Sequence, residues 1–198
     1  MPRFIENPEE YGLPEDLAAI GGEINTKTLI EAYQGGIFPW PESDELPVLW
    51  FCPNPRGILR HEKLHFSRSL KRTLRQKKFK IQSDTAFDDV ITRCQKSVRK
   101  GQGGTWITPN MKSAYMALHR DGIAHSVEAW ADGKLVGGLY GVYLNNTFSG
   151  ESMFHTCSDA SKVALATLMT ALNAAGVHWM DTQMITPVVE ALGGELIS

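Results

Sequence analysis

The change of hydrophobic period after Gly122 is the feature that most constrains how this 198-residue chain can fold. Apolar and polar residues alternate from His125 to Trp130, and a second apolar run extends from Leu135 to Tyr143. The pairs Asp132-Gly133 and Asn145-Asn146 follow these runs and are typical of two-residue hairpin turns. We therefore expect an antiparallel meander in this part of the chain.

Helical patterns lie on both sides of this meander. Thr108-Pro109 begins a helix that Gly122 ends, and Ser158 begins a long helix that ends at Gly176. A buried strand is expected from Val177 to Met180. Shorter helices are expected after the N-caps Thr26, Ser67 and Asp84 and from Thr186-Pro187 to Gly193-Gly194, with a break from Gly101 to Gly104.

This order of elements favours an α+β fold. From residue 61 onward it is the order of an acyltransferase domain of the Gcn5-related N-acetyltransferase (GNAT) type, with a mixed sheet flanked by helices. Five prolines between Pro39 and Pro55 indicate an irregular or extended seam before that domain. The chain is therefore predicted to have a small N-terminal domain, residues 1–60, and a GNAT-like domain, residues 61–198.

Composition excludes several classes of protein. The N-terminus has no apolar signal segment, and the longest nearly apolar run, Leu135 to Leu144, is too short to span a bilayer. The three cysteines form no C-x-x-C pair, and the histidines have no carboxylate or thiol at metal-ligand spacing. We expect a cytoplasmic monomer that needs no metal or cofactor and contacts no membrane.

Positive charge is concentrated in one segment. Residues 60–80 hold nine basic side chains and a single acidic one, whereas residues 1–59 hold three basic and ten acidic ones. On the helix expected after Ser67, four basic residues fall at i, i+3, i+4 and i+7, which places them on one face: Arg68, Lys71, Arg72 and Arg75. Such a face can follow the phosphates of a nucleic acid, and a solvated surface is the alternative.

Eleven segments carry a resemblance to a known family. They are Ile20–Gly22, Ala32–Trp40, Leu49–Trp50, Pro53–Arg56, Leu64–Ser69, Gly104–Thr108, Ala124–Glu128, Leu135–Val142, Gly150–Phe154, Ala160–Lys162 and Asp181–Gln183. Over nearly its whole length the chain resembles the bacterial leucyl/phenylalanyl-tRNA-protein transferases. The resemblance implies transfer of Leu, Phe or less readily Met from aminoacyl-tRNA to proteins that begin with Arg or Lys, which marks those proteins for degradation by the N-degron route.

The resemblance also assigns site residues. Glu151, which is expected at the start or end of a strand, is assigned to the Arg or Lys of the acceptor protein, with a surface salt bridge as the alternative. Asp181 and Gln183 are assigned to the reaction centre, and their i, i+2 spacing directs both side chains to one side of a strand. We expect Gln183 to orient the attacking amine and Asp181 to stabilise the developing ammonium. The aminoacyl pocket is assigned to Trp40, Trp106, Leu139, Phe148 and Met153, although the last three could also be ordinary core residues.

Two other functions stay open at this point. An acetyl-CoA-dependent N-acetyltransferase would share the fold, but the segment from Phe154 to Ser161 lacks the glycines of a pyrophosphate-binding loop. A non-catalytic tRNA-binding module would explain the basic segment but not Asp181 and Gln183. The chain departs from the family pattern at His155, Thr182 and Val188 and stops at Ser198, where many relatives continue, which leaves the ranking of Leu, Phe and Met undetermined.

Overall fold

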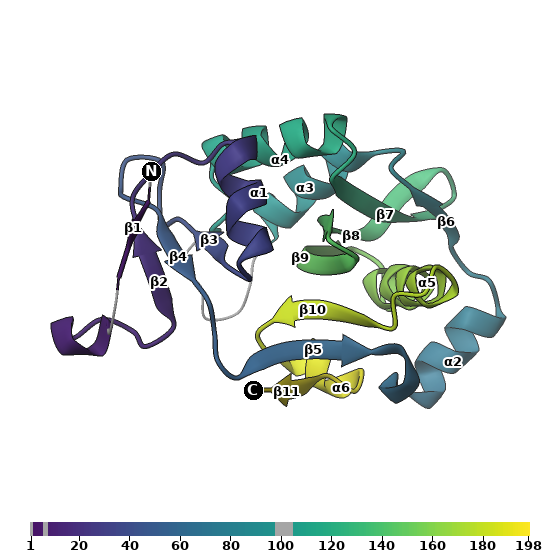
Figure 1. Ribbon diagram of the computed structural model, residues 1–198. Coiled ribbons are helices and arrows are strands. Elements are labelled where there is room, and N and C mark those ends of the chain that lie inside the picture. Colours follow the sequence, from purple (N-terminus) through teal and green to yellow (C-terminus); the bar gives the residue numbers. More distant parts are fainter. Residues whose placement is uncertain (1, 6–7, 98–104) are drawn as a thin grey trace.

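The computed structural model describes residues 2–5, 8–97 and 105–198 and shows an α+β fold with two sheets (Figure 1). The large sheet has seven strands in the order β11-β5-β10-β9-β8-β7-β6. Only β9 and β10 pair in parallel, so the sheet is mixed, as predicted. Its strands are β5 (Arg56–Arg60), β6 (Lys80–Ser83), β7 (Ala124–Ala131), β8 (Lys134–Leu144), β9 (Thr147–His155), β10 (Trp179–Gln183) and β11 (Glu195–Ile197).

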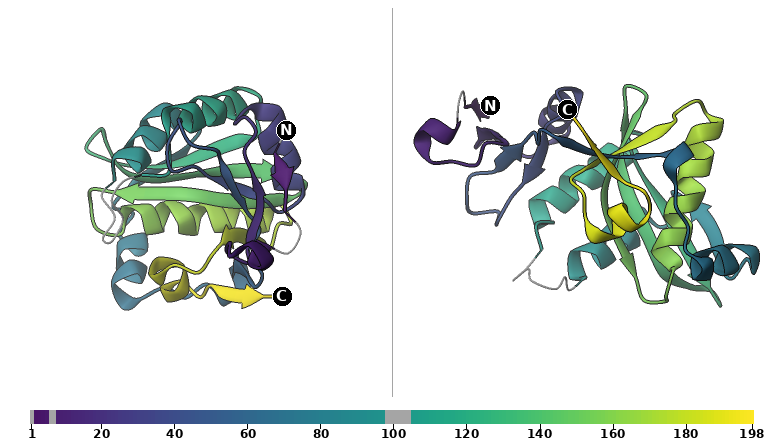
Figure 2. Two further views of the ribbon diagram at one scale, coloured as in Figure 1. Left: turned by 90° about the vertical axis from the view of Figure 1, so that its left-hand side faces the viewer. Right: turned by 90° about the horizontal axis from the view of Figure 1, so that it is seen from below.

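The small sheet comes from the N-terminal part of the chain and stands to one side of the large one (Figure 2). Its four antiparallel strands have the order β1-β2-β4-β3. They are β1 (Arg3–Phe4), β2 (Leu17–Ile20), β3 (Phe38–Trp40) and β4 (Leu49–Phe51), and the helix α1 (Thr26–Gln34) and the 3₁₀ turn η1 (Pro8–Tyr11) accompany them.

Helices cover both faces of the large sheet (Figure 1). On one face α3 (Phe87–Lys96) and α4 (Pro109–Arg120) pack on the meander, with α1 against α4. On the other face lies α5 (Ala160–Ala174), with α2 (Arg68–Arg75) beside it. Neighbouring β8 residues alternate between the two cores: Tyr140 lies in the α3/α4 core and Leu139 in the α5 core. The remaining elements are η2 (His61–Lys63) and α6 (Pro187–Ala191).

The predicted meander is confirmed. β7, β8 and β9 pair antiparallel, and both two-residue turns have positive φ at their two central positions. Asp132 and Gly133 have φ of 49° and 72°, and Asn145 and Asn146 have 49° and 63°. Asn, Asp and Gly tolerate this left-handed backbone, which matches the twist of a hairpin. The sequence therefore determined this part of the sheet by local turn chemistry.

Ser67, Thr108 and Thr186 are N-caps as predicted, but three other helix starts were wrong. Asn25, one residue before Thr26, caps α1 by accepting a hydrogen bond from the Thr28 amide at 3.0 Å. Asp84 does not cap α3, because its carboxylate accepts from the Ser126 amide and contacts His125 on β7. The long helix begins at Ala160, two residues after Ser158.

Two further expectations concern how the chain is divided. The boundary near residue 60 remains a prediction, and β5, which ends there, is an inner strand of the large sheet. The predicted break from Gly101 to Gly104 lies outside the described residues. Among the residues that are described, no helix combines the length and apolar character needed to span a bilayer.

Gly137 lets α5 lie directly on β8, and we predict that Gly137→Ala destabilises the fold. A Cβ at this position would lie 2.6 Å from the Cβ of Ala160 and 2.9 Å from the Ser161 nitrogen. Such overpacking typically costs about 1–3 kcal/mol. In the control variant Gly35→Ala the nearest atom would be at an ordinary 3.5 Å. Urea unfolding measures both variants, and an equal change in the two would contradict this account of the packing of α5 on β8.

Candidate active site

Glu151 projects from a bulge in the middle of β9. Its neighbours Gly150 and Ser152 pair with Gly141 and Tyr140 of β8, so Glu151 is an extra residue without an opposite partner. A bulge of this kind bends the strand and redirects one side chain. The sequence placed Glu151 at the start or end of a strand. The structure corrects this, because the bulge turns the side chain within a continuous strand.

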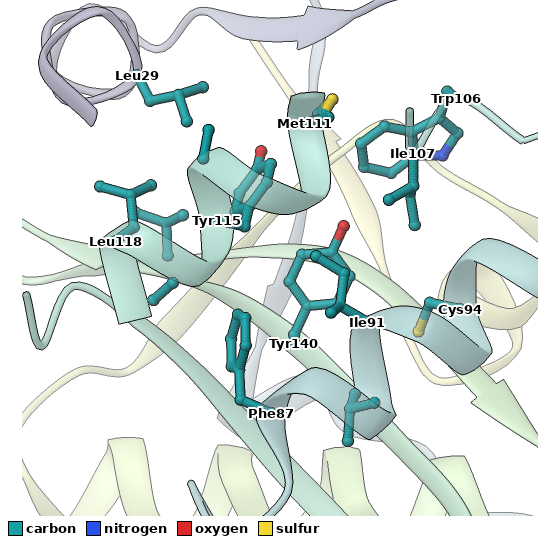
Figure 3. Close-up of a cluster of buried hydrophobic side chains, with 14 of the residues drawn as sticks. Leu29, Phe87, Ile91, Cys94, Trp106, Ile107, Met111, Tyr115, Leu118 and Tyr140 are labelled. Carbon is teal, nitrogen blue, oxygen red and sulfur yellow. The ribbon is translucent and has the colours of Figure 1, made fainter. Parts of the chain in front are cut away.

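Three hydrogen-bond donors surround the Glu151 carboxylate. Oε1 accepts from the Tyr33 hydroxyl at 2.7 Å and from Gln183 Nε2 at 2.8 Å, and Oε2 accepts from the Tyr115 hydroxyl at 3.1 Å. The two tyrosine hydroxyls also contact each other. Tyr115 is buried and rises from α4 among the apolar side chains of the α3/α4 core (Figure 3). These donors therefore come from α1, α4 and β10.

No Lys or Arg forms an ion pair with Glu151 within the described part of the chain. The surface salt bridge that the sequence left open is thus not what the structure shows. Burial raises the pKa of Glu151 to about 7, and the charge of Asp181 acts in the same direction, whereas the hydrogen bonds from Tyr33, Tyr115 and Gln183 act against it. A cation brought next to Glu151 would favour its charged form.

Burial also raises the pKa of Tyr33 and of Tyr115 well above 10, and the adjacent Glu151 adds to this shift. Both hydroxyls therefore keep their protons near neutral pH. They can act as hydrogen-bond donors that hold the carboxylate in place, but they are poor proton acceptors.

Asp181 forms an ion pair with Arg56 across the β10–β5 pair. Arg56 Nε donates to Asp181 Oδ1 at 2.9 Å, and Arg56 Nη2 donates to Oδ2 at 2.7 Å. The third nitrogen, Nη1, donates to the Gly36 carbonyl at 2.8 Å, and the guanidinium lies over the Phe38 ring. Burial acts to lower the pKa of Arg56, but the hydrogen bonds and charge of Asp181 outweigh it and raise this pKa.

Gln183 follows in a second bulge, between Asp181 and Gln183. Its φ is +64°, which is uncommon for a residue with a side chain. Its backbone amide donates to Asp181 Oδ1 at 2.8 Å. The side chain then reaches Glu151 through Nε2. Asp181 and Gln183 thus join one network, but the left-handed backbone and not simple strand alternation directs Gln183. Thr182, between them, has a buried hydroxyl with no hydrogen bond to a described residue.

The five residues predicted for one aminoacyl pocket belong to two groups. Trp40, at the end of β3, stacks on Trp106 just before α4, with ring centroids 5.4 Å apart and an angle of 19° between the planes. This pair lies with the α3/α4 core. Leu139, Phe148 and Met153 lie with the α5 core, where the first two are buried and Met153 is half-buried.

Sequence reasoning gave no role to three residues of the network. Tyr33 and Arg56 both fall in the segments that carry the family resemblance, but neither was singled out. Tyr115 falls in the helix expected between Thr108 and Gly122 and was not singled out either. Arg56 could have been recognised from its position between Pro55 and Gly57 at the start of a buried strand, because a buried arginine there needs an acidic partner.

The basic face of α2 is exposed. Arg68, Lys71, Arg72 and Arg75 all lie at the surface, and no described acidic residue forms an ion pair with any of them. The Thr73 hydroxyl donates to Asp159 just before α5 at 3.1 Å and helps to hold the helix. α2 follows the end of β5 that is opposite to Arg56 (Figure 1).

Neither a metal site nor a cavity competes with this network. No three His, Cys, Asp or Glu side chains of the described residues are arranged to hold a metal ion. A cavity of about 610 Å³ lies between α1, α4 and the segment from Pro41 to Val48, but no residue of the Glu151 network lines it. We place the candidate site at Glu151, because buried polar chemistry marks a reactive centre better than hollow shape does.

Comparison with known proteins decides the family. A family model described as "Leucyl/phenylalanyl-tRNA protein transferase" matches residues 58–198, and the model of that family's N-terminal domain matches residues 22–54. The chain belongs to this family. A leucyl/phenylalanyl-tRNA-protein transferase of Aromatoleum aromaticum is 51% identical over 95% of this chain and 79% of its own length, and one of Desulfatibacillum aliphaticivorans is 52% identical over 91% and 77%.

The predicted enzyme class is thereby confirmed. As a member of the leucyl/phenylalanyl-tRNA-protein transferase family, the chain is an aminoacyltransferase and not a non-catalytic module. The similarity to one solved structure is distant. A GCN5-related N-acetyltransferase-like protein of Streptococcus suis covers 87% of this chain and 64% of its own chain, with 14% identity and a TM-score of 0.40. The strands and helices themselves define the fold.

The shifted Glu151 predicts a pH dependence of stability. The folded chain keeps the Glu151 proton up to about pH 7, whereas an unfolded chain loses it near the ordinary value of 4.5. Stability from this residue is therefore complete below pH 4.5 and is lost as pH rises through about 7. We expect the unfolding free energy of the wild type to fall over this range relative to Glu151→Gln. Urea unfolding at several pH values measures this difference, and parallel curves would contradict it.

Proposed function

We propose that this enzyme transfers Leu or Phe, and less readily Met, from aminoacyl-tRNA to the α-amino group of proteins with an N-terminal Arg or Lys. The observation that carries the proposal is the Glu151 carboxylate, which is half-buried, has no basic partner among the described residues and is held by three donors. A site of this kind is complementary to one cation. In the cytoplasm the product would then be marked for degradation.

Two hydrogen-bond acceptor positions are open for the acceptor protein. A carboxylate offers about four acceptor positions, and the three donors to Glu151 leave one of them on Oε2. Gln183 Oε1 accepts no hydrogen bond from any described residue. The side-chain cation of an N-terminal Arg or Lys fits Glu151, and the α-amine fits Gln183 Oε1, so that the two groups of one residue are bound together.

The reaction needs little chemical activation beyond this placement. The neutral α-amine attacks the ester carbonyl, the new C–N bond forms, and the C–O bond to the ribose breaks. The nitrogen gives up one proton, and the departing ribose oxygen gains one. Since an amide side chain has no useful basicity near pH 7, Gln183 orients the amine and does not remove its proton. Holding ester and amine together can supply roughly 7–11 kcal/mol of the barrier reduction.

The donor binds through its apolar side chain and its phosphates. The half-buried Met153, which packs with the buried Leu139 and Phe148, and in the other core the stacked Trp40 and Trp106 are apolar and aromatic side chains of the kind that suits Leu, Phe and Met alike. The exposed basic face of α2 contacts the tRNA backbone. The enzyme works as a monomer.

Loss of the Glu151 charge should weaken binding of the acceptor and not of the donor. With labelled Leu-tRNA and an Arg-starting peptide, we expect Glu151→Gln to raise the KM for the peptide by about 10–100-fold, as losing a charged hydrogen bond does. The KM for Leu-tRNA should stay the same. For the wild type, the KM for the peptide should fall as pH rises through about 7.

The controls for this experiment separate the effect of losing any carboxylate from the effect of losing the one at Glu151. Glu190→Gln removes an exposed carboxylate from α6 and should change neither constant. An Ala-starting peptide should accept little label. An unchanged peptide KM in Glu151→Gln would show that the acceptor cation binds elsewhere.

The basic face of α2 predicts a salt-dependent effect on tRNA. We expect the triple variant Lys71→Gln, Arg72→Gln and Arg75→Gln to raise the KM for Leu-tRNA and to lower its dependence on salt, by roughly one unit of log–log slope for each phosphate left without its basic partner. A control with the same charge change replaces Lys27, Arg120 and Lys134, which are exposed outside α2. Equal effects of the two triple variants would mean that only net charge matters.

A further inference from the structure

We propose that Arg56 is a positioning residue of this site. It donates hydrogen bonds to both oxygens of the Asp181 carboxylate, so that Asp181 sets the position of Gln183 and does not itself bind the ammonium of the acceptor. The inference rests on the proposed function. It changes the role expected for Asp181 from sequence and adds a residue that sequence reasoning did not select. Its basis is the set of contacts around Asp181, Gln183 and Glu151.

The Asp181 carboxylate has no acceptor position left. Arg56 donates to both oxygens, the Gln183 amide donates to Oδ1, and the Ser149 hydroxyl lies 3.3 Å from Oδ2. These four hydrogen bonds match the roughly four acceptor positions of a carboxylate. Asp181 is also 7% exposed as a residue, and its charge is balanced by the guanidinium. An incoming ammonium would have to displace one of these donors.

The same contacts place Gln183. Its amide hydrogen bond to Asp181 spans two residues and closes the bulge in which Gln183 takes its positive φ. A non-glycine residue in this conformation costs free energy and persists only when its surroundings hold it. Arg56 orients the carboxylate through two parallel hydrogen bonds, the geometry that a guanidinium provides and an ammonium does not.

Arg56 also reaches the other side of Glu151. Nη1 donates to the carbonyl of Gly36, two residues after the end of α1, and α1 carries Tyr33. Glu151 Oε1 therefore accepts from two groups, Tyr33 and Gln183, whose segments are joined through one guanidinium. A change at Arg56 should loosen both donors without touching either of them.

The test compares kcat and KM in variants of the full chain. In the assay with labelled Leu-tRNA and an Arg-starting peptide, we expect Arg56→Gln to lower kcat about 100-fold, the scale of a misplacement of about 1 Å, with the KM for Leu-tRNA within about threefold of wild type. Arg56→Lys keeps the positive charge but loses the two parallel hydrogen bonds to Asp181, and we expect its kcat to fall at least about tenfold. Lys112→Gln breaks the α4–α3 ion pair with Asp88 and should leave both constants unchanged.

The double variant separates positioning from direct action. Asp181→Asn alone keeps an oxygen for the Gln183 amide but leaves Arg56 without its anion. The double variant Arg56→Gln with Asp181→Asn removes both charges and keeps an oxygen for the Gln183 backbone amide. We expect its kcat to be at least about fivefold above that of either single variant, the kind of coupling that residues in contact show. Thermal unfolding followed by circular dichroism shows which variants fold. If Arg56→Gln does not fold, Arg56→Lys and the double variant decide.

The outcomes are distinct. Recovery in the double variant supports the inference, and a double variant no better than Asp181→Asn overturns it, because Asp181 would then act on the ammonium directly. A kcat of Arg56→Lys or Arg56→Gln within about threefold of wild type also overturns it, since a misplaced Gln183 should cost far more than this. A wild type that moves no label overturns the proposed function, and this inference with it.

Discussion

A half-buried carboxylate with no basic partner among the described residues must be held by hydrogen bonds, and the site is organised around this need at Glu151. Its donors come from α1, α4 and β10, which are far apart in the chain. A different element places each donor. Tyr33 lies on α1, which packs on α4; Tyr115 lies on α4 in the α3/α4 core; and Gln183 lies in a bulge that a hydrogen bond to Asp181 closes. The network can therefore form only when α1 and α4 are packed against each other and on the large sheet.

Under the proposed function, the two substrates carry charges of opposite sign. The exposed basic face lies on α2, which follows one end of β5, whereas Arg56 at the other end of β5 holds Asp181 (Figure 1). Arg56 and Asp181 form an ion pair, so their charges balance each other. Under the proposed function, the basic helix binds polynucleotide phosphates and Glu151 binds a cation.

Much of the fold could be predicted because its signals are local. The meander follows from alternation and from turns built of Asp, Gly and Asn, and the helices α2, α4 and α6 begin at the caps that the sequence indicates. Asp84 shows where local reasoning fails. It is a good capping residue by type, but its carboxylate binds β7, a partner that sequence distance hides. The stacked Trp40 and Trp106 are likewise brought together from separate segments, apart from Leu139, Phe148 and Met153.

The sequence by itself determined the class of fold, the family and the basic helix, and the family resemblance assigned Glu151, Asp181 and Gln183 to the site, which remains a prediction. These depend on residue type and on spacing within short segments, which a linear chain displays directly. Only the tertiary structure decided that Glu151 sits on a bulge, that Tyr33 and Tyr115 donate to it, and that Arg56 occupies Asp181. These contacts join residues 36 to 125 positions apart, and only the packing of the strands and helices brings such residues within hydrogen-bond distance.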